Sequence, residues 1–117
     1  MEIIFEISGT TLVAELFGEM DHHSSEKVRN DIDETMINYK AKHLIFDFSR
    51  VTFMDSSGIG IILGRYKKLK EKGGFVIVPA CSPQIQNILN MAGVLSIIEY
   101  MDTKEEAIDF LQRKEVS

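Results

Sequence analysis

Residues 53–66, FMDSSGIGIILGRY, join a strand-like segment to a helix-like one, and the architecture can be worked out from this junction. The side chains just before Asp55 are apolar, whereas those after it recur at helical spacing. The expected buried arc of this helix is formed by Ile59, Ile62, Leu63, Tyr66 and Leu69. Asp55, Ser56 and Ser57 would occupy its first turn, where unpaired N–H groups carry partial positive charge. One of the three is therefore expected to cap the helix.

Strand-like and helix-like segments alternate along the rest of the chain as well. Two β-rich runs, 2–7 and 11–17, flank a turn at 8–10 and predict a hairpin that ends at Gly18. Later strands are expected at 43–49, 75–78 and 97–100, and helices after Ser24, Asp55, Ser82 and Asp102. The order β-β-α-β-α-β-α-β-α predicts a single α/β domain over residues 1–117. It would have a mostly parallel or mixed sheet of about four to five strands and about four helices, opening with the β-hairpin.

In a sheet of this kind the loops after the parallel strands meet at one edge, where ligand and partner sites are commonly found. His22 and His23 follow the second expected strand, and Ser56 and Ser57 follow the third. We therefore expect these four residues to lie at the same end of the molecule.

Composition narrows the classes of function. The net charge of -5 argues against a nucleic-acid-binding protein, which normally presents a basic face. No apolar run approaches the roughly 20 residues that a membrane span requires. Cys81 is the only cysteine, which excludes an internal disulfide, and the N-terminus does not resemble a signal peptide. These features predict a cytoplasmic protein whose partners include neither nucleic acid nor membrane.

One face of the helix after Asp55 is unusually flat. Ile61 lies nearly opposite the expected buried arc, and the neighbouring Gly60 and Gly64 have no side chains. Two glycines within a helix cost up to about 2 kcal/mol relative to alanine, so their presence calls for a reason. Either this face packs closely against a neighbouring helix, or a partner protein docks on Gly60, Ile61 and Gly64. The sequence leaves both interpretations open.

The serines do not fit a catalytic site. In the α/β-hydrolase order the histidine base follows the nucleophile, whereas all three histidines precede Ser56. MDSSG also lacks the first glycine of the nucleophile elbow, and the spacing from Gly60 to Gly64 does not match a P-loop. His22 and His23 do not predict a metal site, because the set of ligands is incomplete. We predict no catalytic residue, no cofactor and no metal, and therefore that the protein is not an enzyme.

Two regulatory alternatives remain. A phosphoaspartate receiver domain fits the length and the alternation, with Asp47 or Asp55 as phosphoacceptor, but its acidic pair is missing and the opening hairpin does not suit it. Alternatively, a serine is the substrate of another protein. A phosphate there would add a charge of about -1.5 to -2, which a helix N-terminus tolerates but Asp55 would repel. The residues alone leave Ser56 and Ser57 indistinguishable.

Three segments carry a resemblance to a known family: GEMDHHS at 18–24, FMDSSGIGIILGRYK at 53–67, and the SP…MAGV segment at 82–94. They closely resemble the anti-sigma-factor antagonists with a STAS domain, and the D-H-H and L-G-R-Y sequences point to the sporulation branch. The resemblance implies that the unmodified protein binds a dimeric, ATP-bound anti-sigma factor that is also a serine kinase, which frees the sporulation sigma factor.

The resemblance also assigns roles to residues. It implies that the kinase phosphorylates the serine directly after the aspartate, here Ser56, and that a metal-dependent serine phosphatase restores the protein. Asp55 would position the loop for kinase binding. The free protein is expected to be a monomer, and the same switch could instead serve a stress-response or signalling pathway. The expected partner-binding residues are Glu19, Asp21, His22, His23, Met54, Asp55, Ser56, Ser57, Gly58, Gly60, Ile61 and Gly64.

Overall fold

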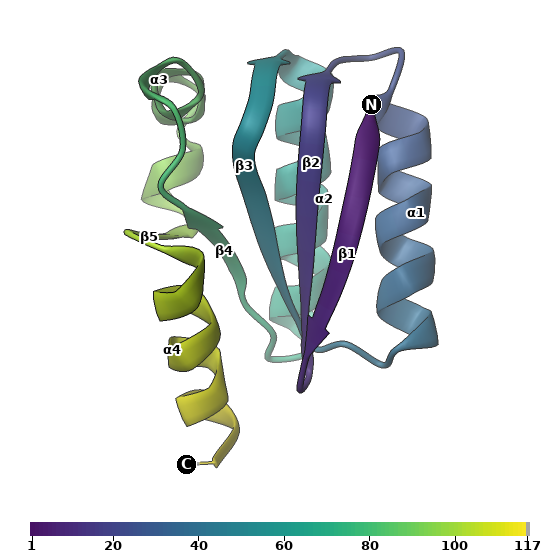
Figure 1. The fold of residues 1–117 in the computed structure, drawn as a ribbon, viewed down its shortest axis with the longest axis vertical. Coiled ribbons are helices and arrows are strands. Elements are labelled where there is room, and N and C mark those ends of the chain that lie inside the picture. The colour runs from purple at the N-terminus through teal and green to yellow at the C-terminus, as the bar shows by residue number, and fades with distance from the viewer. Residues whose placement is uncertain (117) are drawn as a thin grey trace.

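The chain begins with an antiparallel hairpin of β1 (Glu2–Ser8) and β2 (Thr11–Met20), and helices join all the later strands (Figure 1). The computed structural model describes residues 1–116. The later elements are α1 (Ser25–Asn38), β3 (His43–Met54), α2 (Ser56–Glu71), β4 (Val76–Pro79), α3 (Pro83–Met91), a 3-10 turn (Val94–Ser96), β5 (Glu99–Met101) and α4 (Lys104–Val116). The five strands pair in the order β1-β2-β3-β4-β5, with every pair after the hairpin parallel. The predicted mixed α/β fold and its element order are confirmed.

The sheet is covered on both faces, and β3 is buried between the two layers. Helices α1, α2 and α3 pack on one face around Leu44, Phe46 and Phe48; in Figure 1 α2 lies behind the strands and α1 stands beside β1. Helix α4 covers the other face over a smaller cluster that includes Ile45 and Leu111. No helix within residues 1–116 has the length and apolar character that a membrane crossing requires.

Two strands run further than the sequence predicted, and their extra length builds the candidate site. Strand β2 was expected to end at Gly18, but it continues to Met20. Gly18 adopts a φ of 102° at a register shift next to Glu19, so a bulge takes up the irregularity without ending the strand. Strand β3 likewise continues past residue 49 to Met54. As a result Met20 and Met54 are partners in the sheet, and the two strands end side by side.

The predicted orientation of α2 is partly wrong. Ile62 is fully buried as expected, but Ile61 is only 5% exposed and does not lie on an outer face. Arg65, a charged residue that would ordinarily be solvated, is 8% exposed. The reason is that α2 contacts α1 as well as the sheet, so a second flank of the helix, including positions 61 and 65, is covered. A hydrophobic arc calculated for one buried face cannot anticipate a flanking helix.

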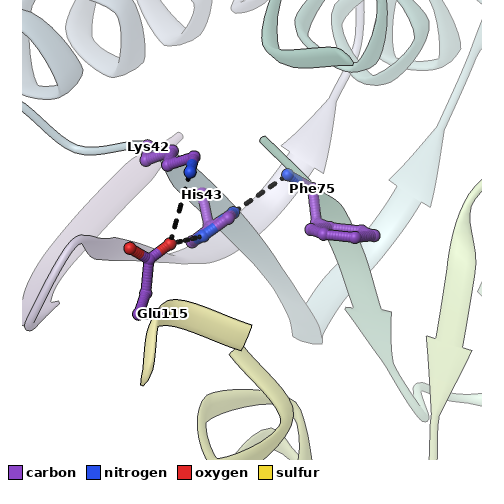
Figure 2. A network of polar contacts seen from close by, with 4 residues as sticks. All are labelled: Lys42, His43, Phe75 and Glu115. Carbon is purple, nitrogen blue, oxygen red and sulfur yellow. Dashed lines mark hydrogen bonds and ion pairs between the residues drawn. The ribbon is translucent and has the colours of Figure 1, made fainter. Parts of the chain in front are cut away.

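The end of the molecule away from the strand carboxyl termini is held by His43, which is 1% exposed (Figure 2). Its Nδ1 accepts the N–H of Phe75 at 3.0 Å, so the ring proton resides on Nε2, which donates to Oε1 of Glu115 at 2.5 Å. The hydrogen bond from His43, assisted by the charge of Lys42, holds the pKa of Glu115 below its usual value against some desolvation. The last turn of α4 is thereby tied to the beginnings of β3 and β4.

Candidate functional site

The candidate site is a corner where the loops after β2 and β3 meet, at the top of Figure 1. The N–H of Asp55 donates to the carbonyl of Met20 at 3.3 Å, so the two loops are joined directly after their strands end. The sequence predicted that residues 22 and 23 would share one end of the molecule with residues 56 and 57, and this prediction is confirmed. The parallel pairing of β2 and β3 is the cause, because it brings both carboxyl ends to the same edge.

Asp55 is the residue that organises the corner. Its Oδ1 accepts the N–H groups of Ser57 at 2.8 Å and Gly58 at 3.4 Å, which makes it the N-cap of α2. Its Oδ2 accepts the N–H of His22 at 3.2 Å. One carboxylate therefore begins the helix and also holds the neighbouring loop. The sequence predicted a cap among residues 55–57, but the bond to His22 could not be read from it.

The loop after β2 is ordered by its own aspartate. Asp21 Oδ1 accepts the N–H groups of His23 at 3.0 Å and Ser24 at 3.1 Å. Desolvation acts to raise the pKa of Asp21, but these two backbone donors and the nearby His23 outweigh it, and the pKa lies below its usual value. The rings of His22 and His23 are exposed, with centroids 4.0 Å apart. The loop therefore presents two imidazoles and two carboxylates, those of Glu19 and Asp21, beside Asp55.

The two serines differ in their surroundings. Ser56 is the first residue of α2 and is exposed, whereas Ser57 is partly buried and gives its N–H to Asp55. Neither side-chain hydroxyl hydrogen-bonds to any other residue in the described part of the chain. Ser56 therefore presents the more accessible hydroxyl, a difference that the sequence did not reveal.

The three glycines of α2 fall into two groups. A Cβ at Gly58 would lie 2.7 Å from Cγ of Met54 and 2.9 Å from the carbonyl oxygen of Met20, so only glycine lets α2 begin this close to the strand ends. A Cβ at Gly60 or Gly64 would meet nothing within 4 Å. Close packing against a neighbouring helix is therefore the wrong explanation for Gly60 and Gly64. Their backbone borders open space on the flank of the corner.

The structure divides the expected partner-binding residues by exposure. Met54 is 2% exposed and Ile61 5% exposed, and Gly58 is buried as well, so these three support the corner from within. They leave little surface open to a partner. The residues that keep some surface are Glu19, Asp21, His22, His23, Asp55, Ser56, Ser57, Gly60 and Gly64.

Beside the corner, a groove of about 630 Å³ runs between the start of β1, the end of β2 and the start of α1. Glu19, Asp21 and His23 form part of its lining, together with Lys27, whose Nζ pairs with Asp31 at 2.6 Å. Residues 18–24 and 53–58 contain no lysine or arginine, so the corner itself is acidic. No group of three or more His, Cys, Asp or Glu side chains in residues 1–116 is placed to hold a metal ion.

The fold is a five-stranded mixed sheet that opens with a hairpin. An aspartate-capped helix begins where two parallel strands end side by side. Together these features define one class of small α/β domain. The STAS domain family matches residues 2–107 of the chain. The chain belongs to this family, among its anti-sigma factor antagonists.

Individual relatives agree with this assignment. The chain is 36% identical to the anti-sigma F factor antagonist of Paenibacillus polymyxa, over 96% of each chain. It is 34% identical to the anti-sigma factor antagonist SpoIIAA, solved in its unphosphorylated form, with a TM-score of 0.75 over 95% of this chain and 98% of the other. It is also 34% identical to the Bacillus cell fate determinant SpoIIAA in the phosphorylated form, with a TM-score of 0.73 over 94% and 99% of the two chains.

Proposed function

We propose that this protein is a phosphorylation-controlled antagonist of an anti-sigma factor in a sporulation pathway. In its unmodified form it binds an anti-sigma factor, an ATP-bound dimer that is also a serine kinase, and so frees the sigma factor. Phosphorylation of Ser56 ends the binding, and a metal-dependent serine phosphatase restores it. The observation that carries the proposal is the exposed, unbonded hydroxyl of Ser56 beside Asp55 at the start of α2. The relatives support it, since SpoIIAA exists in an unphosphorylated and a phosphorylated form.

The docking surface we propose is composite. One part is the loop after β2, with Glu19, Asp21 and the two exposed histidines, and the other is the first turns of α2 with the open flank of Gly60 and Gly64. Asp55 joins the two parts through its bond to the N–H of His22. The glycines let a partner approach the helix backbone closely. The helix cost of up to about 2 kcal/mol that they impose is then offset by binding.

A phosphate on Ser56 would act on docking and leave the fold intact. Two of the first N–H groups of α2, those of Ser57 and Gly58, already donate to Asp55. The two loops contain no lysine or arginine to neutralise a charge of about -1.5 to -2. The phosphate would therefore remain in water. A partner that covered it would have to desolvate it next to a carboxylate, which costs several kcal/mol.

We assign the chemistry of the cycle to the kinase and the phosphatase, and none to this chain. The receiver-domain alternative finds little support in the geometry. Asp47 is 9% exposed and accepts the N–H of Ser49 at 3.0 Å, and the Asp55 carboxylate accepts three backbone N–H groups. Burial of Asp47 and the three donors on Asp55 disfavour both carboxylates as phosphoacceptors. An acid-stable phosphoprotein would exclude a phosphoaspartate, since acyl phosphates hydrolyse readily.

Phosphosite mapping tests the assignment of Ser56. The protein is incubated with the neighbouring anti-sigma factor kinase and ATP, alongside Ser56→Ala and the matched control Ser57→Ala. We expect one phosphate on Ser56, the same phosphate in Ser57→Ala, and none in Ser56→Ala. Modification of Ser57 alone, or no modification, would contradict the proposal.

Binding measurements test the electrostatic account. Ser56→Asp should bind the kinase at least about tenfold more weakly, equivalent to about 1.4 kcal/mol. Ser56→Ala should bind normally but never be released by ATP, so that the sigma factor stays active. Near-normal affinity of Ser56→Asp would contradict a charge-based switch. A kinase gene and a sigma-factor gene adjacent to this one would favour sporulation over a stress-response or signalling pathway.

A further inference from the structure

The two edges of the sheet differ in length and in protection. Strand β5 at one edge has three residues, whereas β1 at the other edge has seven. An edge strand is commonly protected by proline, by lysine or by a bulge. Strand β1 contains neither residue type, and its register with β2 is unbroken from Glu2 to Ser8. None of its residues is buried. It is therefore an open edge at which another strand could pair.

Every second residue of β1 turns its backbone N–H and carbonyl groups away from β2. The hairpin closes on Ser8 and Thr11 around a two-residue turn, and the closing pair of such a hairpin is hydrogen-bonded. Thr10 agrees with this phase, because its carbonyl accepts the N–H of Lys42 at 2.7 Å and so points toward β3. The even-numbered residues of β1 thus bond to β2. The outward backbone groups, unbonded within residues 1–116, belong to Ile3, Phe5 and Ile7.

The side chains of β1 alternate between two sides of the sheet. Ile3 and Phe5 pack on the core beneath α1 and α2, and Ile7 on the same side is 38% exposed. On the other side Ile4 is 51% exposed, and no helix lies in front of β1 in Figure 1. An added strand would therefore find apolar neighbours on both of its sides.

The surface around Ile4 is acidic. Glu2 and Glu6 flank it along β1, about 13 Å apart, and Glu15 is its partner on β2. The Nζ of Lys104 lies 4.0 Å from Oε2 of Glu6, but a largely exposed pair at this distance contributes little. The charges on this side of β1 are therefore complementary to a segment that carries basic residues on both sides of an apolar one.

Space for a further strand is present beside β1. The groove of about 630 Å³ described above runs along Met1, Glu2 and Ile3 and is bordered by Ser24 and Lys27 near the start of α1. The ammonium of Lys27 is already paired with Asp31, so it does not neutralise the carboxylates of β1. A strand in this position would lie between α1 and solvent.

We propose that β1 accepts an extended segment of a partner protein as a sixth strand, in which two basic residues flank an apolar one. Strand addition to an open edge is a recurring mode of peptide recognition. The segment runs antiparallel to β1, the slightly more stable of the two pairings. Its basic side chains meet Glu2 and Glu6, and the apolar side chain between them lies over Ile4. The site follows the edge of the sheet and does not depend on the proposed anti-sigma factor cycle.

The probe is the peptide acetyl-TKVIVKT-amide, titrated into the ¹⁵N-labelled protein. We expect saturable amide shifts at residues 2–8 and slower hydrogen exchange at the outward N–H groups of Ile3, Phe5 and Ile7. N-methylation of both valines removes the donors that face β1 and should weaken binding at least about tenfold. N-methylation of the isoleucine and the second lysine, whose N–H groups face away, is the matched control and should leave binding unchanged. Equal losses in the two methylated peptides, or no saturable binding of the parent peptide, would overturn the proposal.

Charge reversal locates the interaction on the protein. The double variant Glu2→Lys, Glu6→Lys should bind this peptide at least about tenfold more weakly and should prefer acetyl-TEVIVET-amide. The double variant Glu71→Lys, Glu99→Lys changes the net charge equally at exposed positions away from β1. It should lose no more than about twofold, because only screened long-range attraction is affected. Equal weakening by the two double variants would reduce the binding to net charge and refute the site.

A second copy of this chain is the competing occupant of the edge. Sedimentation of the free protein should show a monomer at the concentrations of the titration. A dimer that slows hydrogen exchange at Ile3, Phe5 and Ile7 without any peptide would show that the edge serves self-association, and it would overturn the proposal of a partner segment.

Discussion

At each end of the sheet, one polar side chain joins segments that are far apart in the sequence. The surfaces at the two ends are nevertheless very different. At the carboxyl end, Asp55 joins loops whose bonded residues are 33 positions apart, and at the opposite end His43 reaches Glu115 over 72 positions. Asp55 accepts only backbone N–H groups and leaves the rings of His22 and His23 and the hydroxyl of Ser56 exposed. His43 instead accepts the N–H of Phe75 and donates to the carboxylate of Glu115, so both of its ring nitrogens are used (Figure 2). One polar side chain therefore organises an exposed corner at the carboxyl end of the sheet, and another ties buried segments together at the opposite end. We call these the corner and the closed end.

Partner binding and stability should therefore depend on opposite ends of the sheet. Residues at the closed end should matter to folding and hardly at all to a partner. Substitutions at the corner should weaken the binding of a partner more than they lower the free energy of unfolding.

The largest expected loss of stability is at the closed end. His43→Ala leaves the buried N–H of Phe75 without an acceptor and Glu115 without a donor, and it opens a cavity, so unfolding should become easier by about 2–3 kcal/mol. Binding of the anti-sigma factor by the folded fraction should not change. Chemical denaturation and a binding titration measure the two effects. His43→Gln, which retains an acceptor and a donor, is the matched control and should lose less.

Asp55→Ala should cost less stability and more binding. Loss of a helix cap lowers the free energy of unfolding by about 1–2 kcal/mol. The bond to the N–H of His22 is lost as well, which frees the loop after β2 from the start of α2. Affinity for the anti-sigma factor should therefore fall further than in His43→Ala. Asp55→Asn, which keeps an oxygen acceptor for the helix cap, serves as the control. The proposed separation would be wrong if the two alanine variants affected binding equally.

Gly60→Ala should move stability and binding in opposite directions. A Cβ there meets nothing within 4 Å, so the helix should gain up to about 1 kcal/mol. The methyl group should nevertheless weaken binding of the partner if the open flank is a docking surface. The matched variant Gly58→Ala should instead be destabilised, because its Cβ would lie 2.9 Å from the carbonyl oxygen of Met20. Unchanged affinity in Gly60→Ala would remove this flank from the docking surface.

The smallest expected effect is a pH dependence at the closed end. Because the pKa of Glu115 is lowered in the folded protein, its contribution to stability is present above its ordinary pKa of 4.5. The contribution is lost as the pH falls through the lowered pKa of the folded state. Glu115→Gln should accordingly be less stable than the parent protein at neutral pH, and the difference should shrink below about pH 4. Denaturation midpoints at several pH values measure this, and a difference that grew in acid would contradict the assignment.

Much of the architecture could be predicted because it follows from local patterns. The turn at residues 8–10, the apolar strand before residue 55 and the proline after Ser82 gave the element order, and Ser82 is the N-cap of α3, as its position suggested. The ends of β2 and β3 were missed, since a bulge at Gly18 has no distinct signature in a single sequence. The buried flank of α2 at Ile61 and Arg65 was missed as well, because it depends on a second helix that only the folded chain brings alongside.

The sequence by itself determined the alternation of strands and helices, the aspartate at a helix start and the family, because these depend on residue types at short spacings along the chain. The tertiary structure alone decided that Asp55 reaches His22, that Ser56 is more open than Ser57, and that Gly60 and Gly64 border empty space. It also decided that Arg65 is buried beside Asp33 of α1. These four facts depend on distances between segments that are remote in sequence, and such distances are fixed only when the parallel strands pair and the helices pack across them.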